Sequence, residues 1–175
     1  MRRGASIRPR LDLGVPVLCE LLIEQQAVSR YPFHWPLPFP VEDFLVRDHE
    51  QASRVAELDG SVAGQVTITS VGSELSCADF RTGTGCPDPA VVSAMFVSTA
   101  MRGRGVGNLL LETAVAWARK RDRVPVLDVV APPDTALTFY QHHGWVEIGR
   151  RRVDWLPHDN PYVHSLALPP FTAHR

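Results

Sequence analysis

The sequence predicts a single α/β domain in which a mixed, mostly antiparallel sheet is flanked by helices. Strand-like runs and segments with helical spacing alternate along all 175 residues, which is the pattern of one interleaved fold. Residues 90–97 and 124–130 are almost wholly apolar, as strands buried on both faces are. With 45% hydrophobic residues the chain can bury one core, and no linker, repeat or low-complexity segment divides it. We therefore expect residues 1–175 to form one domain.

The first third of the chain predicts a strand, a helix and a proline-rich loop. Residues 6–10 favour a short strand, and Asp12 is a suitable N-cap for the helix that follows. One face of this helix should carry Val15, Leu18, Leu22 and Gln26. The segment "YPFHWPLPFP" at 31–40 holds too many prolines for regular structure. A short helix is expected at 41–47.

A β-hairpin should follow at residues 52–71, because two apolar-rich runs flank Asp59-Gly60 and that pair tolerates the positive φ of a tight turn. We expect a loop at 71–89 and a strand at 90–97. The remaining expected elements are a helix at about 105–121, a strand at 124–130, a short helix within 133–144 that Gly144 ends, and strands at 145–154 and 162–168.

Composition narrows the class of protein. A net charge of −1 and a pI near 6.6 provide no global field for nucleic acid or anionic lipid. The odd cysteine count favours reduced thiols, although Cys77 and Cys86 flank one loop and could pair. No apolar stretch follows the charged N-terminus or is long enough to span a bilayer, and the histidines lack ligand spacing. We expect a cytoplasmic protein without a metal site or a membrane or nucleic-acid partner.

The segment "RGRGVG" at 102–107 predicts a phosphate site. It joins the strand at 90–97 to the start of a helix, where unpaired N–H groups and the helix dipole attract anions. Alternating glycines let main chain approach a phosphate without interference from Cβ atoms, and two arginines add positive charge. A glycine-rich turn that serves packing alone is the alternative.

The residues that this segment lacks narrow the choice of phosphate ligand. It has no Gly-Lys-Ser/Thr ending, which disfavours a magnesium-nucleotide site. Asp128 stands about where a dinucleotide fold would place its ribose-binding acid, but the glycines alternate as G-x-G-x-G, and residues 98–101 separate them from the strand. A dinucleotide site therefore stays a remote alternative.

Two motifs together resemble the GCN5-related N-acetyltransferase superfamily. Residues 102–107 fit its R/Q-x-x-G-x-G/A pattern, and "ALTFYQHHGW" at 136–145 is similar to its A-x-x-x-Y-x-x-x-G-F/W segment. The order of elements also matches over most of the chain. The resemblance implies the acyl-CoA N-acyltransferase fold, whose central strands separate where acetyl-CoA binds; here these would be 94–97 and 127–130.

The resemblance also assigns residues to acetyl-CoA. Amides of residues 104–108 would hold the pyrophosphate, and the edge of 95–97 would pair with the pantetheine arm. Pro133 stands where the family often has asparagine, so main chain or Asp134 would substitute. The implied cofactor-binding residues are Met95, Phe96, Val97, Arg102, Gly103, Arg104, Gly105, Val106, Gly107, Asn108, Asp134 and Tyr140.

Tyr140 matches the family tyrosine that protonates the departing thiolate, a transfer that suits a phenol of pKa near 10. The alternative is a core aromatic. The family's glutamate on its fourth strand is absent, since Val91 stands there. The acceptor's base could then be His34, Asp43 or Glu74, or the proton could leave through solvent.

The acceptor wall implied by the resemblance lies at 31–40, where an aromatic lining would favour apolar bulk or a cation against the rings. Its residues are Tyr31, Phe33, His34, Trp35 and Phe39. Packing of these aromatics on the core is the alternative. We expect an N-acetyltransferase that transfers acetyl from acetyl-CoA to a primary amine in a ternary complex. The alternative is a CoA-binding regulatory module without turnover. A homodimer is expected by family analogy.

Overall fold

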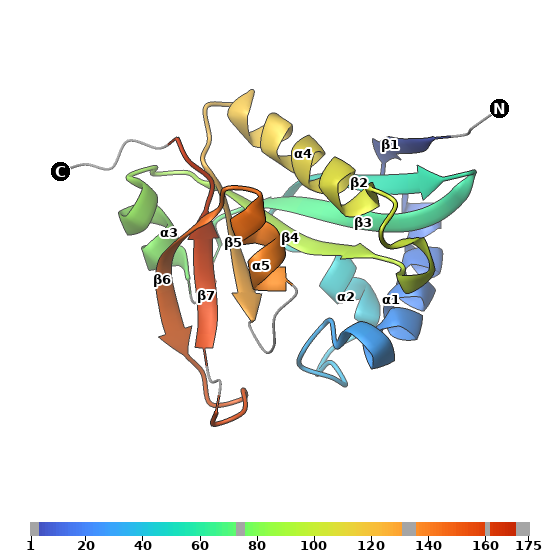
Figure 1. The fold of residues 1–175 in the computed structure, drawn as a ribbon, viewed down its shortest axis with the longest axis horizontal. Coiled ribbons are helices and arrows are strands. Elements are labelled where there is room, and N and C mark those ends of the chain that lie inside the picture. The colour runs from blue at the N-terminus through green and yellow to red at the C-terminus, as the bar shows by residue number, and fades with distance from the viewer. Residues whose placement is uncertain (1–3, 73–75, 131–135, 160–161, 171–175) are drawn as a thin grey trace. The chain divides into compact units, whose positions relative to one another are not determined.

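The computed structural model describes residues 4–72, 76–130, 136–159 and 162–170. Within these residues, seven strands are hydrogen-bonded in the order β1-β2-β3-β4-β5-β7-β6 (Figure 1). The β1–β2, β2–β3, β5–β7 and β6–β7 pairs are antiparallel, and β4 runs parallel to β5. The mixed, mostly antiparallel sheet with helices confirms the predicted fold class.

The chain divides into two compact units, Met1–Thr69 with Val92–Trp117, and Ser70–Val91 with Ala118–Arg175. The first unit contains β1 (Ala5–Pro9), α1 (Val15–Ser29), α2 (Val41–Leu45), β2 (Glu50–Leu58) and β3 (Ser61–Ser70). The second contains α3 (Cys77–Thr84), β5 (Pro125–Val130), α5 (Ala136–His142), β6 (Val146–Arg152) and β7 (Tyr162–Ala167). Three elements have residues in both units: β4 (Ala90–Val97), α4 (Val106–Arg119) and β3, of which only Ser70 belongs to the second unit.

The β2–β3 hairpin confirms the prediction made from the Asp59-Gly60 pair. Both residues have positive φ, 54° and 86°, and Leu58 pairs with Ser61 across the turn. Further along β3, a Cβ on Gly64 would collide with the Phe96 carbonyl oxygen of β4 and lie 3.0 Å from the Val97 Cα. Only glycine lets β3 come this close to β4 at that point.

Helix α1 packs the first unit's core and corrects two expectations. Asp12 does not cap it: a 3₁₀ turn at Asp12–Gly14 precedes the helix, and neither turn nor helix has a side-chain cap. The fourth buried position is Gln25, not Gln26, because three further residues from Leu22 return to the same face. The apolar cluster around α1 joins α1, α2, β2 and β4 through Leu18, Leu22, Phe44, Leu45, Val55, Ala94 and Phe96.

Helix α3 was not expected, since its segment was predicted to be a loop. It contacts β6 and β7, and its Phe80 is fully buried in a separate apolar cluster with Val91, Val126 and Ala167. Cys77 opens the helix, and its sulfur accepts a hydrogen bond from the Arg81 guanidinium at 3.1 Å. The cluster gives the second unit its own core.

The other boundaries lie within a few residues of those predicted, and β4 coincides with its prediction. Gly144 has φ +83° just after α5, which confirms it as the helix stop. Asp134 and Pro133 lie outside the described residues. The parallel register between β4 and β5 covers Ala90↔Pro125 and Val91↔Val126, and the separation of 94–97 from 127–130 stays a prediction.

Candidate functional site

The glycine loop leads from β4 into α4 in the first unit. Gly103 and Gly105 have φ +73° and +80°, and nothing lies within 4 Å of the position that a Cβ would take at either residue. Both glycines are therefore required by backbone conformation, and the space above them is open. The first hydrogen bond of α4 runs from the Leu109 N–H to the Gly105 carbonyl, at 3.0 Å. The amides of residues 106–108 precede it and have no carbonyl partner within the helix.

These amides form a site suited to a phosphate group. Val106 is 1% exposed and anchors the helix start in the core, whereas Gly105 and Asn108 are exposed. The buried face of α4 repeats every four residues from Val106 through Leu110 and Ala114 to Ala118. The N-terminal tip is thus fixed while Gly107 stays partly exposed and Asn108 exposed, and the helix dipole makes the tip electropositive.

The two loop arginines do not stand free beside the glycines. Arg102 donates through Nη2 to Gln25 Oε1 at 3.1 Å and through Nε to the Val97 carbonyl at 3.4 Å. Arg104 forms an exposed ion pair with Asp59 of the β2–β3 turn, at 2.7 Å. Any anion at the helix tip would therefore compete with these protein partners for the arginines.

Gln25 joins the glycine loop to the proline-rich loop. Its Nε2 donates to the Tyr31 carbonyl at 2.5 Å, and its Oε1 accepts from Ser29 Oγ at 2.6 Å in addition to Arg102. The sequence expectation missed this residue because it placed Gln26 on the buried face. The spacing from Leu18 and Leu22 is the signal that identifies it.

The edge of β4 after Ala94 is the segment expected to pair with the pantetheine arm. Phe96 is buried, and Met95 and Val97 are partly exposed. Ala94 has φ +45°, which is uncommon for a residue other than glycine, so the strand changes direction just before this segment. The Ala94 carbonyl accepts a hydrogen bond from Gln65 Nε2 at 3.2 Å.

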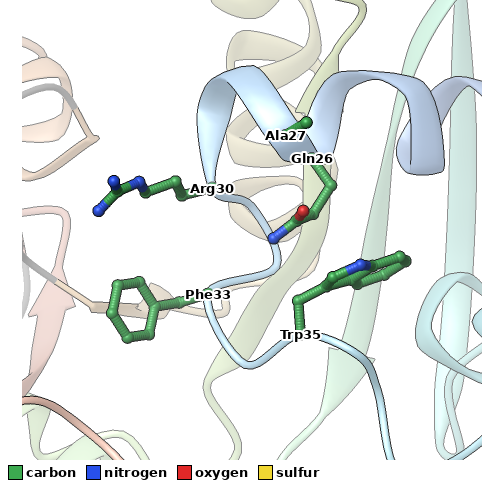
Figure 2. A pocket seen from close by; sticks show the side chains of 5 residues that line it. All are labelled: Gln26, Ala27, Arg30, Phe33 and Trp35. Carbon is green, nitrogen blue, oxygen red and sulfur yellow. The ribbon is translucent and has the colours of Figure 1, made fainter.

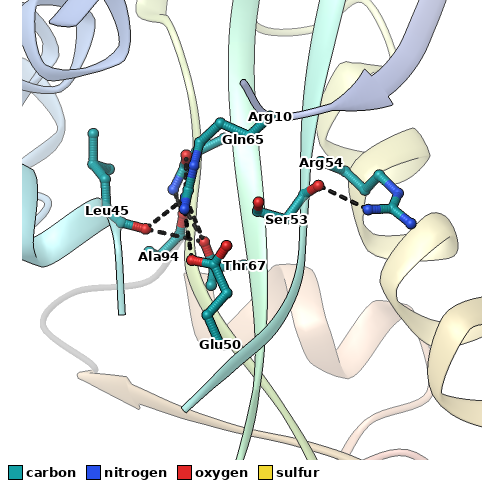
Figure 3. Close-up of polar contacts among 8 residues, drawn as sticks. All are labelled: Arg10, Leu45, Glu50, Ser53, Arg54, Gln65, Thr67 and Ala94. Carbon is teal, nitrogen blue, oxygen red and sulfur yellow. Dashed lines mark hydrogen bonds and ion pairs between the residues drawn. The ribbon is translucent and has the colours of Figure 1, made fainter. Parts of the chain in front are cut away.

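Gln65 belongs to a buried polar network at Arg10 (Figure 3). Arg10, whose side chain is 5% exposed, pairs with Glu50 at 2.6 Å. Its Nη1 also donates to the Leu45 carbonyl, to Gln65 Oε1 and to Thr67 Oγ1, at 2.8, 3.2 and 3.3 Å. The charge is thus compensated from several directions, as a buried guanidinium requires. No sequence motif marked these residues.

The aromatic residues of 31–40 do not form one lining. Phe33 and Trp35 line a hollow of about 330 Å³ with Gln26, Ala27 and Arg30 at the end of α1 (Figure 2). Tyr31 instead packs edge-on against Phe44, with ring centroids 5.6 Å apart, and belongs to the first unit's core. His34 and Phe39 are exposed. Core packing therefore holds for Tyr31, whereas a role of Phe33 and Trp35 in an acceptor wall stays a prediction.

The charge of Arg30 changes the class of ligand expected in this hollow. Arg30, which adopts φ +56° at the end of α1, is one of the lining residues, and its side chain extends away from Gln26 and Trp35 (Figure 2). A positive charge at the rim disfavours a cation against the rings and favours an anion beside apolar bulk. A cation against the rings stays a prediction from the sequence, and an anion beside apolar bulk is the second possibility that Arg30 adds.

Tyr140 lies on α5 in the second unit and is partly buried. Its ring packs edge-on against Phe139 and Trp145, with centroids 5.3 and 5.7 Å away. The Tyr140 carbonyl accepts from the Trp145 N–H at 3.1 Å, which ties the helix end to the residue after Gly144. The packing fixes the direction of the ring, which a proton donor and a core aromatic both require.

None of the candidate bases stands out. His34 and Asp43 are exposed, and Glu74 lies outside the described residues. Val91, which replaces the family's glutamate, is buried in the second unit's apolar cluster. In the described part of the chain, no three His, Cys, Asp or Glu side chains are arranged as metal ligands. Nor does any helix in that part combine the length and apolarity needed to cross a membrane.

Comparison with known proteins agrees with this geometry. The family model described as "Acetyltransferase (GNAT) family" matches residues 18–145, which include both the glycine loop and Tyr140. No curated protein sequence matches the chain at a significant level.

Solved structures share the fold over nearly the whole chain. The ribosomal-protein-S18-alanine N-acetyltransferase from Escherichia coli superimposes with a TM-score of 0.65 and 20% identity, covering 97% of this chain and 96% of that one. Arabidopsis thaliana Naa50, in complex with the bisubstrate analogue CoA-Ac-MVNAL, superimposes with a TM-score of 0.66 and 14% identity. The match covers 95% of this chain and 99% of that one. A Corynebacterium glutamicum structure described as "histone acetyltransferase HPA2 and related acetyltransferase" superimposes with a TM-score of 0.68 and 19% identity. The match covers 97% of this chain and 98% of that one.

Proposed function

Because the chain belongs to the acetyltransferase (GNAT) family, whose acyl donor is acetyl-CoA, we propose that it acetylates a primary amine by direct attack in a ternary complex. The observation that supports this most is the glycine loop at the start of α4. Its two glycines with positive φ, the open space above them and the amides of residues 106–108 suit the diphosphate of coenzyme A. A cytoplasmic location and a homodimer are part of the same proposal.

The proposed reaction needs a neutral amine, a fixed thioester and a proton donor. The thioester of acetyl-CoA supplies a carbonyl carbon that an amine can attack. The amine nitrogen forms the new C–N bond, the C–S bond breaks, and the sulfur takes a proton from the Tyr140 hydroxyl. The proton that the amine loses goes to solvent or to a base such as His34 or Asp43. Main chain at residues 95–97 and 104–108, with Asp134, would hold the coenzyme so that its thioester is positioned for attack by the amine.

Thiol release tests the proposal. Wild-type protein with acetyl-CoA and a broad amine panel should release free thiol, and Tyr140→Phe should lower kcat by about 10²-fold or more. Tyr162→Phe is the matched control, since Tyr162 also belongs to the second unit and lies under the Arg150 guanidinium. Equal rates for Tyr140→Phe and wild type would remove the role given to Tyr140.

The alternative is a CoA-binding regulatory module, favoured by the absence of an acid on β4. Calorimetry of coenzyme A binding and the thiol-release assay together distinguish the two functions. Coenzyme A binding with no thiol release across the panel would establish the module, and thiol release would exclude it. Lys120 is the chain's only lysine, so acetylation of the protein itself can be followed at that residue and the N-terminus by mass spectrometry.

We further propose that the acceptor carries an anionic group beside apolar bulk, because Arg30, Phe33 and Trp35 line the hollow together. Amino acids should then be better acceptors than the corresponding amides. Arg30→Asn should abolish this preference, since asparagine tolerates φ +56° and lacks the charge, whereas Arg30→Lys should retain part of it. An unchanged preference in Arg30→Asn would place the acceptor elsewhere.

A further inference from the structure

We propose that Gln65 is a positioning residue for the pantetheine arm of coenzyme A. Its side-chain amide holds Ala94 in a backbone conformation that directs the edge of β4 at residues 95–97. The inference rests on the proposed function and assigns to Gln65 a part that neither motif of the sequence indicated. All the residues involved belong to the first unit.

The first observation is the conformation of Ala94. Its φ of +45° lies in the left-handed region, which residues with a Cβ rarely adopt and which glycine would adopt freely. Ala94 is 3% exposed and contributes to the first unit's apolar cluster, so the strain sits inside the core and not in a loose loop. Buried strain of this kind persists only where the surroundings hold it, and such strain often marks a functional position.

The second observation is what holds Ala94. Gln65 is fully buried, and its Nε2 donates to the Ala94 carbonyl at 3.2 Å. Its Oε1 accepts from Arg10 Nη1 at 3.2 Å, so the amide is oriented by a guanidinium that Glu50 in turn fixes at 2.6 Å (Figure 3). The contact to Ala94 is thus the end of a chain of charge-assisted hydrogen bonds.

The third observation is that residues 96–98 are held close to β3. Gly64 approaches the Phe96 carbonyl so closely that no Cβ would fit, and the Ser98 N–H donates to the Ala63 carbonyl at 2.8 Å. The segment that follows the bend at Ala94 is therefore fixed in position against β3. Releasing the Ala94 carbonyl would change the direction in which residues 95–97 present their peptide groups. The diphosphate site at residues 104–108 does not contact Gln65 through any hydrogen bond found in the described part of the chain.

The substitution Gln65→Glu removes the donor to the Ala94 carbonyl, together with the hydrogen bond from Nε2 to Thr67 Oγ1 at 3.3 Å, which the control Thr67→Val also removes. The carboxylate that it introduces would have nearly the same shape as the amide and would still accept from Arg10, which keeps the network charged and paired. It could not donate to the Ala94 carbonyl, and its oxygen would repel that carbonyl. Thr67→Val is the matched control: Thr67 is equally buried and contacts Arg10, Gln65 and the Leu45 carbonyl, but not Ala94.

The measurement compares two ligands by calorimetry and by displacement. Coenzyme A has both the diphosphate and the pantetheine arm, whereas ADP has only the diphosphate. For Gln65→Glu we expect the Kd of coenzyme A to rise about 10-fold and that of ADP to change less than about twofold. Thr67→Val should lower the melting temperature yet leave the ratio of the two Kd values unchanged. A merely structural role for Gln65 would weaken both ligands together.

Each other outcome overturns the inference. Equal weakening of both ligands, or unchanged coenzyme A binding by a folded Gln65→Glu, contradicts it while the proposed function stands. If wild-type protein binds coenzyme A but not ADP, 3′-phospho-ADP takes the place of ADP because it also carries the third phosphate of coenzyme A. Failure to bind that ligand contradicts the inference, since the diphosphate would then not be held independently of the arm. Wild-type protein that binds no coenzyme A contradicts the proposed function itself, and the inference falls with it. If Gln65→Glu fails to fold, Gln65→Met is measured against the same outcomes.

Discussion

At the scale of single residues, Asp59 has two roles that can be separated. With φ +54° it forms the hairpin turn together with Gly60, and its carboxylate pairs with Arg104 of the glycine loop. The first role depends on backbone conformation and the second on charge. Asparagine tolerates the same φ without the charge, so Asp59→Asn changes only the second.

We expect Asp59→Asn to strengthen coenzyme A binding about two- to fivefold at low salt. The substitution releases Arg104 and removes a negative charge near the diphosphate, and both effects favour an anion at the helix tip. Titration calorimetry at about 20 and about 300 mM salt measures it, and the gain should shrink at the higher salt, since both side chains are exposed. Weaker binding by Asp59→Asn would show that the Asp59–Arg104 pair helps to hold the loop.

Tyr31 provides a pH-dependent contribution to stability. Burial raises its pKa to about 12, and the nearby Arg47 guanidinium opposes that rise. The fold therefore favours the protonated phenol. Its contribution is fully present below pH 10, the ordinary value, and is lost as pH rises from 10 through 12.

We expect wild-type protein to lose about 1.4 kcal/mol more unfolding free energy than Tyr31→Phe between about pH 9 and about pH 11. Urea unfolding at the two pH values measures the difference, and the other tyrosines cancel in it. If the two proteins lose equal free energy, the Tyr31 phenol is more exposed to water in solution than its packing against Phe44 indicates.

The single residues that could be predicted are those whose own chemistry dictates their backbone. Gly103, Gly105, Gly144 and the Asp59-Gly60 pair were recognisable because few residues tolerate positive φ. Gln25 and Gln65 were not recognisable, because the role of a buried glutamine depends on residues far along the chain. Gln25 accepts a hydrogen bond from Arg102, and Gln65 donates one to the Ala94 carbonyl. Ala94 itself looks like an ordinary strand residue in the sequence.

At the scale of elements, regular patterns predicted the strands and long helices, and packing decided the rest. The apolar run at 90–97, which only Ser93 interrupts, predicted β4 to the residue. Helix α3 was missed because "CADFRTGT" is short and contains Gly83 and threonines, which are poor helix formers. Its burial of Phe80 against the second unit's cluster compensates for that weak propensity. The hollow at Arg30 depends on how the proline-rich loop returns to α1, which no local pattern specifies.

The same substitution, glycine to alanine, should destabilise the protein more at Gly64 than at Gly105. Gly64→Ala places a Cβ against the Phe96 carbonyl, so β3 and β4 must move apart, and we expect a loss of about 2 kcal/mol or more. Gly105→Ala meets open space and incurs only the strain of φ +80°, about 1 kcal/mol. Urea unfolding measures both.

Coenzyme A binding tests the role proposed for Gly105 in holding the diphosphate. Gly105→Glu adds bulk and negative charge beside the amides of residues 106–108 and should weaken binding by at least about 100-fold. Undiminished binding by folded Gly105→Glu would place the diphosphate elsewhere.

At the scale of the whole molecule, two apolar clusters are connected by elements that run through both units. One cluster surrounds α1 and the other contains Phe80, and each lies within one unit. Strand β4 and helix α4 each contribute residues to both units, so neither unit can unfold without disrupting an element of the other. We therefore expect a single unfolding transition.

Coenzyme A should shift that entire transition, although its proposed diphosphate site lies in the first unit. At a concentration about 100 times its Kd, a ligand that binds only the folded state adds about 2.7 kcal/mol, which for a chain of this length raises the melting temperature by about 5–10 °C. Calorimetric scans with and without coenzyme A measure the shift. Phe80→Leu, a change in the second unit's cluster, should lower both melting temperatures by a few degrees and leave their difference intact. Two transitions, of which coenzyme A moves only one, would show that the units unfold independently despite sharing β4 and α4.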